Sequence, residues 1–158
     1  MAGVQDVAAA LLERRGAMDT FKLQKLVYYC QAWHLVWEDK ALFAEPIEAW
    51  AAGPVVRALY DLHRGSYSVN AWPNGDAREL KKKERRTVEI VADSYGELTG
   101  RRLSLLTHSE HPWQSARAGL GPTDRSDNEI TLVSMKSYYS ALDSDTTAEP
   151  VSSLATDD

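Results

Sequence analysis

The residues best able to do chemistry are His108, Glu110 and His111, which lie close together in the sequence. Imidazoles and a carboxylate at this spacing could bind a metal ion or transfer protons. A metal site would need another ligand, and the remaining histidines, His34 and His63, lie within apolar stripes. Acid–base catalysis would need a nucleophile or a cofactor within reach, and the sequence has no Gly-x-Ser-x-Gly motif and no glycine-rich phosphate loop. We therefore expect no metal, no cofactor and no enzymatic activity, with a hydrolase-like reaction at His108 and Glu110 as the competing hypothesis.

A structural role could explain the same cluster without catalysis. In a turn between two helices, His108 and Glu110 could satisfy buried backbone groups while Trp113 packs beside them. A recognition surface is the third interpretation, because partly exposed tryptophans and tyrosines often anchor protein interfaces. The chain has five tryptophans and seven tyrosines. We expect that some remain exposed, Trp72 in its loop among them.

A second polar group opens the strongest predicted helix, at about residues 21–37. Its first turns carry polar and aromatic side chains beside the apolar stripe: Lys22, Gln24, Lys25, Tyr28 and Tyr29. Lysine in a first turn is poorly placed for the helix dipole, which favours acidic groups there. Two interpretations remain, namely exposed lysines at an ordinary helix start or a fixed anionic partner. Glu48 or Glu110 could be such a partner within the chain.

The elements that must position these groups are mostly helical. Apolar residues at helical spacing, together with capping residues, predict seven helices, at about 4–15, 21–37, 54–64, 87–97, 100–106, 112–117 and 129–142. Gly53 and Pro54 mark the start of the third helix, with proline at its first position. Residues 47–50 alternate weakly and could form a short strand. We predict a mostly α, single compact domain over 1–142, with at most a small β-hairpin near Trp50 and Tyr67.

Charge is distributed unevenly along the 158 residues. The net charge is −5, and residues 143–158 contain five acidic residues but no lysine or arginine. We predict that this acidic tail is disordered, because it has few residues able to bury surface. The rest of the chain is electrically balanced, which gives no general attraction to nucleic acid or to anionic membranes.

The sequence also predicts a cytoplasmic protein that does not enter a membrane. No apolar run approaches the ~20 residues that span a bilayer, and the N-terminus does not have the pattern of a signal peptide. The single cysteine, Cys30, cannot form an internal disulfide. The basic run 81–86 has three interpretations: a solvated loop or helix start, a patch for an acidic partner, or a nucleic-acid contact. The last is the weakest, because no aromatic residues are interleaved with the run.

Several short motifs occur together in a fixed order. They are Lys22-Leu-Gln-Lys-Leu26 with Tyr28 and Tyr29; Glu48-Ala-Trp50 and Gly53-Pro-Val55; Leu105 with Thr107, His108, Glu110, Pro112 and Trp113; and Ile130 with Tyr138 and Tyr139. In order and spacing they resemble the Panacea domain, the family of SocA-like antitoxins and phage GepA-type proteins. The resemblance covers about Met18 to Leu142. The chain departs from the pattern in its polar linker after Gly65 and in its acidic tail.

This resemblance implies an antitoxin of a toxin–antitoxin system, of the kind linked to phage defence, that neutralises a cognate protein toxin by direct binding. The alternative within the family is an adaptor that delivers the toxin to the ClpXP protease. A standard interface buries roughly 800 Å² per partner, which a domain of this size can supply. The motif residues are the candidate partner-binding residues: Lys22, Gln24, Lys25, Tyr28, Tyr29, Trp50, His108, Glu110 and Trp113.

Overall fold

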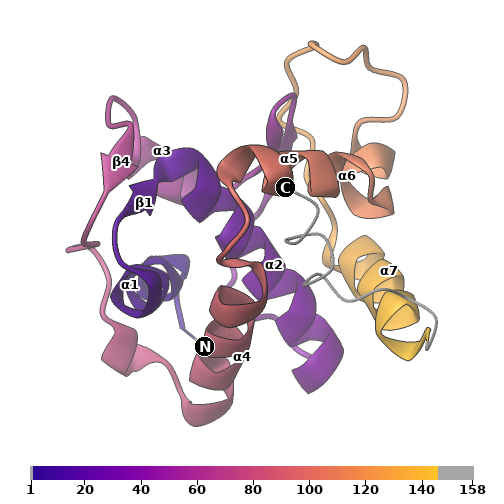
Figure 1. The fold of residues 1–158 in the computed structure, drawn as a ribbon. Helices are drawn as coiled ribbons and strands as arrows, with labels where there is room; N and C mark the ends of the chain where they lie inside the picture. Colours follow the sequence, from indigo (N-terminus) through magenta and orange to yellow (C-terminus); the bar gives the residue numbers. More distant parts are fainter. Residues whose placement is uncertain (1, 146–158) are drawn as a thin grey trace.

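The structure of this chain, a computed structural model, describes residues 2–145 and confirms the predicted mostly α class (Figure 1). Within these residues the α-helices are α1 (Val4–Arg15), α2 (Thr20–Glu38), α3 (Arg57–His63), α4 (Lys82–Tyr95), α5 (Gly100–His108), α6 (His111–Ala116) and α7 (Leu132–Ser144), with one 3₁₀ turn, η1 (Ala77–Glu79). No helix of the described part is long and apolar enough to cross a membrane.

Helix α2 forms the centre of the domain, and α1, α4, α5 and α7 pack around it (Figure 1). Its start is capped by Asp19, whose carboxylate accepts a hydrogen bond from the Lys22 backbone N–H at 2.7 Å. Every residue from Leu23 to Leu35 is buried. A helix enclosed on all sides must satisfy its polar side chains inside the protein, because an unpaired buried polar group costs free energy. The partners of those side chains therefore define the candidate site.

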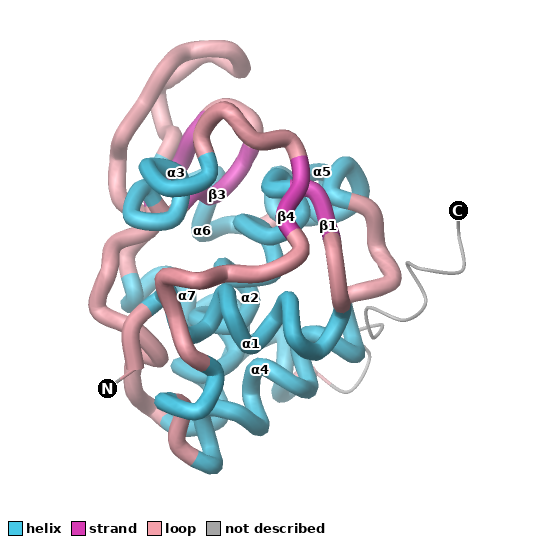
Figure 2. Tube along the Cα trace, turned by 90° about the vertical axis from the view of Figure 1, so that its left-hand side faces the viewer, coloured by secondary structure: helices cyan, strands magenta, loops and turns pink. Residues whose placement is uncertain are grey.

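Two short antiparallel strand pairs complete the described fold. Strand β2 (Glu48–Trp50) pairs with β3 (Gly53–Val55), which confirms a small hairpin at Trp50, although Tyr67 is not part of it. Strand β1 (Met18–Asp19) pairs with β4 (Ser68–Val69), as Figure 2 shows. The β2–β3 hairpin contacts α2, and it is the element that brings Trp50 into the site.

The prediction that Gly53 and Pro54 start a helix is wrong, since both lie in strand β3 and α3 begins at Arg57. Proline is tolerated here because the strand is an edge of a two-stranded pair. The Gln24 side chain fixes the turn into α3 by hydrogen-bonding both backbone groups of Val56. Its Oε1 accepts from the Val56 N–H at 2.8 Å, and its Nε2 donates to the Val56 carbonyl at 3.2 Å.

Other boundaries also differ from the predicted ones. Helix α4 begins at Lys82, so the basic run is a helix start, as one of its interpretations held. The Glu84 carboxylate is buried and accepts a hydrogen bond from the Lys81 N–H at 2.8 Å. Trp72 is only 6% exposed and donates to Gln5 at 2.6 Å, so the expected exposure of this tryptophan is wrong. Helix α7 ends at Ser144, so the predicted disorder of 143–158 is wrong for its first two residues, and residues 146–158 lie outside the described part of the chain.

Candidate functional site

The predicted partner-binding residues come together around α2, the β2–β3 hairpin and the turn between α5 and α6. Five of them are buried: Gln24, Lys25, Tyr28, Tyr29 and Glu110. The other four are half-buried: Lys22, Trp50, His108 and Trp113. In this conformation the buried five lie beyond the reach of another protein's side chains. Their contribution to binding would be to shape the surface above them, and partner binding by the whole set stays a prediction.

The partner of Lys22 is a backbone carbonyl at the end of a helix, and neither Glu48 nor Glu110. Its Nζ donates to the carbonyl of Gly96 at 2.6 Å, at the C-terminal cap of α4. Free carbonyls at a helix C-terminus carry partial negative charge and favour a cation. Burial lowers the pKa of Lys22 from its ordinary value. The lysine that is poorly placed for its own helix is therefore well placed for α4.

Lys25 is fully buried and has few partners. Its Nζ donates to the Pro54 carbonyl at 3.3 Å and lies 4.0 Å from the centre of the Phe21 ring. Burial lowers its pKa to about 7, against the opposing influence of Asp19. Neither carboxylate proposed from the sequence is its partner. Glu48 pairs with Arg57 at 3.0 Å, and Glu110 binds tyrosine hydroxyls.

Gly53 is required where the hairpin passes over Lys25. Its φ is +128°, and a Cβ added there would lie 2.5 Å from the Lys25 Cε. We expect Gly53→Ala to lower the free energy of unfolding by about 2 to 4 kcal/mol, through backbone strain and displacement of the lysine. Gly119→Ala is the matched control, because its φ is +86° and no atom lies within 4 Å. Urea denaturation of both variants checks this; equal losses would show that contact with Lys25 is unimportant.

Glu110 is held by two tyrosine hydroxyls inside the core. Tyr29 donates to its Oε1 at 2.6 Å and Tyr139 donates to the same oxygen at 2.7 Å. The Tyr28 hydroxyl lies 3.0 Å from that of Tyr139, which extends the network. Burial raises the pKa of Glu110 to about 7, and the two tyrosine hydrogen bonds oppose that rise. The structural interpretation, in which Glu110 satisfies buried backbone groups, is wrong about its partners, which are side chains of α2 and α7.

His108 stacks on Trp113, with ring centres 4.0 Å apart and planes 11° from parallel. The indole N–H of Trp113 donates to the Trp50 carbonyl at 2.9 Å, which joins α6 to the hairpin. The His108 Nε2 is buried and has no hydrogen-bond partner within the described residues. Burial lowers the pKa of His108 against the opposing effect of a backbone hydrogen bond at Ala52, and the cations Lys25 and Arg117 lower it further. The lowered pKa favours the neutral imidazole, which stacks as a flat ring on Trp113.

Sequence reasoning missed Arg117, which is 5% exposed and anchors the loop after α6. Its guanidinium donates to the carbonyls of Ala49 at 3.0 Å, Gly121 at 2.9 Å and Asp124 at 2.8 Å. It also lies 5.4 Å from the Trp113 ring. A signal was present: the loop 118–127 has few apolar residues, so polar contacts had to hold it in place. Arg117 thereby places the loop next to the hairpin.

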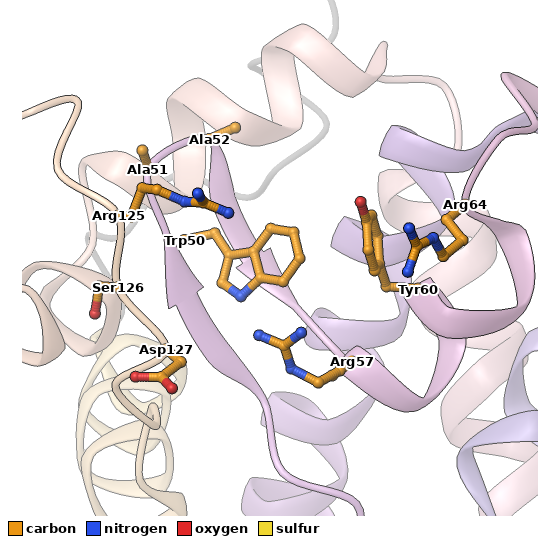
Figure 3. A pocket seen from close by; sticks show the side chains of 9 residues that line it. All are labelled: Trp50, Ala51, Ala52, Arg57, Tyr60, Arg64, Arg125, Ser126 and Asp127. Atoms are coloured by element: carbon orange, nitrogen blue, oxygen red, sulfur yellow. The ribbon is translucent and has the colours of Figure 1, made fainter.

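An open groove of about 710 Å³ lies between the hairpin, α3 and this loop (Figure 3). Its side chains that carry charge or aromatic rings are Trp50, Arg57, Tyr60, Arg64, Arg125 and Asp127. Trp50 is the one predicted partner-binding residue among the groove's lining residues. Its ring meets the Tyr60 ring edge-on at 4.9 Å, and the guanidinium of Arg57 lies 5.3 Å from it. The hairpin that carries Trp50 is in turn joined to α2 by Lys25, which donates to the Pro54 carbonyl.

Comparison with known proteins identifies the family to which this chain belongs. The family described as antitoxin SocA-like, Panacea domain, matches residues 23–114, which is more than half of the chain. The matched region runs from the first turn of α2 into α6, and it contains Lys25, Gly53, Glu110 and Trp113. No curated protein and no solved structure gives a significant match. The chain therefore belongs to the SocA-like antitoxin family defined by the Panacea domain.

Proposed function

We propose that this protein neutralises a cognate protein toxin by binding it directly, as a stoichiometric inhibitor with no chemistry of its own. The observation that carries the proposal is membership of an antitoxin family over the region that contains Lys25, Glu110 and the β2–β3 hairpin. A folded domain that occupies its partner's surface needs shape and charge, and it needs no reacting group.

The contacts of the reactive residues support binding over hydrolysis. The Oε1 of Glu110 is occupied by two tyrosine hydroxyls, and Lys25 is enclosed beneath Gly53. His108 is stacked on Trp113, and burial favours its neutral form. Neither His108 nor Glu110 lines the groove at Trp50. A general acid or base must come within hydrogen-bond reach of its substrate, and these contacts leave little room for one.

Co-expression with the product of the adjacent reading frame tests the proposal. We expect the adjacent protein to stop growth when expressed alone, and this chain to restore growth and to co-purify with it in a stable complex. Protection should persist in cells that lack ClpXP, because occlusion needs no protease. Protection that disappears with ClpXP would instead indicate an adaptor. Loss of protection in His108→Ala with the complex intact would indicate an enzyme.

A further inference from the structure

We infer that the groove beside the β2–β3 hairpin is the docking site for the toxin, and that it receives an extended acidic segment of that partner. This inference rests on the proposed function and adds the place and the chemistry of binding. The groove combines side chains from three separate segments: the hairpin tip 50–52, the helix α3 with Arg57, Tyr60 and its C-cap Arg64, and the loop 125–127 (Figure 3).

The charges of the groove favour an anionic partner. Three arginines line it, against one acidic residue, Asp127. Arg64 and Arg125 are exposed, and within residues 2–145 neither forms an ion pair or a side-chain hydrogen bond. Arg57 is already bound by Glu48 through two nitrogens, at 3.2 and 3.0 Å. The guanidinium fork suits carboxylates, so Arg64 and Arg125 are the two groups available for the partner's acidic side chains.

The aromatic part of the groove is held in place before any partner arrives. The Trp50 indole N–H donates to Glu48 at 2.8 Å, and the Trp50 carbonyl accepts from Trp113. Tyr60 packs edge-on against the Trp50 ring. Trp, Tyr and Arg are the residues most enriched where interfaces gain their binding energy. A rigid aromatic surface flanked by unpaired arginines therefore provides both apolar contact and charge recognition at low ordering cost.

The shape of the groove favours a peptide chain over a small anionic ligand such as a nucleotide. Small-molecule sites usually enclose most of their ligand's surface, whereas this groove is open, and its two available arginines, Arg64 and Arg125, lie on different segments. Its lining includes no glycine-rich phosphate loop. The lysine-rich start of α4 is also basic, and it lies outside the groove, so it serves as the control for charge.

Charge-reversal variants distinguish specific binding in the groove from general electrostatic attraction between the two proteins. The double variant Arg64→Glu/Arg125→Glu should weaken binding of the adjacent-frame toxin, in a catalytically inactive form, by at least tenfold, with slower association at low salt. The control Lys82→Glu/Arg86→Glu makes the same change in net charge at exposed positions of α4, and it should change the dissociation constant less than twofold. Both pairs are exposed, and thermal melting checks that both variants remain folded. Equal weakening by the two pairs would contradict the inference.

Photo-crosslinking identifies what occupies the groove. A benzophenone amino acid at Tyr60 should crosslink to the toxin, in a peptide in which acidic residues outnumber basic ones. The same group at Tyr67, which is 83% exposed, should not crosslink. Crosslinks to a neutral or basic peptide, or binding of ADP that requires Arg64 and Arg125, would overturn the inference. If wild-type protein forms no complex at all, the proposed function fails; if all variants bind equally, only the groove assignment fails.

Discussion

Replacing Lys25 by methionine is expected to stabilise the protein by about 1 to 4 kcal/mol at pH 6, because it removes a buried charge that has little compensation. The lysine is fully buried, and its ammonium has one carbonyl and one ring face as partners. Methionine has a similar length and no charge, so it can fill the space beneath Gly53 with little rearrangement. Urea denaturation of the two proteins gives the difference directly.

The pH dependence of this gain identifies its cause. Folding lowers the pKa of Lys25 from 10.5 to about 7. Between these values the unfolded chain binds more protons than the folded protein, so wild-type stability rises with pH across this window. The advantage of Lys25→Met should therefore be largest below pH 7 and should vanish near pH 10.5. Ionisation of groups that Lys25 does not influence cancels in the difference, whereas Lys25 lowers the pKa of His63 and of His108.

An exposed lysine provides the control for this experiment. Lys82→Met removes the same charge from the solvent-exposed start of α4, and it should change stability by less than about 0.5 kcal/mol at any pH. A Lys25→Met protein that is destabilised, or whose gain does not depend on pH, would show that the lysine is well satisfied in the folded state. If a stabilised Lys25→Met protein still neutralises the toxin, this would further show that Lys25 does not contact the toxin.

Helical periodicity and capping residues were sufficient to predict the class and most of the helices. Asp19 caps α2, Thr99 caps α5 and Thr131 caps α7 through their side chains, as local sequence chemistry suggests. The failure at Pro54 has a tertiary cause. Proline fits the first turn of a helix and the edge of a sheet equally well, and the clamp from Gln24 to Val56 decides between them.

The site was predicted as a set of residues but not as an arrangement. The sequence marks Lys22, Lys25 and Glu110 as polar groups at unusual positions, and each does have a specific role in the core. The partners could not be predicted, because they come from α4, β3 and α7, which lie far from α2 along the chain. Arg64 and Arg125 were not singled out at all. Isolated arginines in a helix end and in a loop have no local signature, and only the fold places them beside one groove.

Removing the Glu110 side chain is expected to cause the largest loss of stability among these variants. In Glu110→Ala, the hydroxyls of Tyr29 and Tyr139 remain buried with no acceptor in place of the carboxylate. Each unsatisfied group costs about 1 to 3 kcal/mol, so we expect a loss of about 2 to 5 kcal/mol near pH 4.5. Glu110→Gln is the matched control, because its amide oxygen can still accept from both tyrosines. An Ala variant as stable as the Gln variant would show that the hydroxyls rotate to other partners.

The same pair of proteins reports the charge of Glu110 as pH changes. Folding raises the pKa of this carboxyl from 4.5 to about 7. Between these values the folded protein binds more protons than the unfolded chain, so wild-type stability falls as pH rises through the window. Glu110→Gln has no ionisable carboxyl at this position and so does not lose stability in this way. Its stability relative to wild type should increase by about 3 kcal/mol from pH 4.5 to pH 8. A constant difference would mean that the carboxylate is ionised without cost.

Together, the two buried charges predict an unusual stability profile. The free-energy cost of burying the ionised Glu110 is fully present above pH 7. The cost of burying the protonated Lys25 is fully present below pH 7. Their sum is therefore greatest near neutral pH. Lys25 and Glu110 share no partner, so their effects should add in Lys25→Met/Glu110→Gln. We expect the double variant to gain most over wild type near pH 7 and less at pH 4.5 and pH 10; a gain that is the same at all three values would show that neither group titrates within the fold.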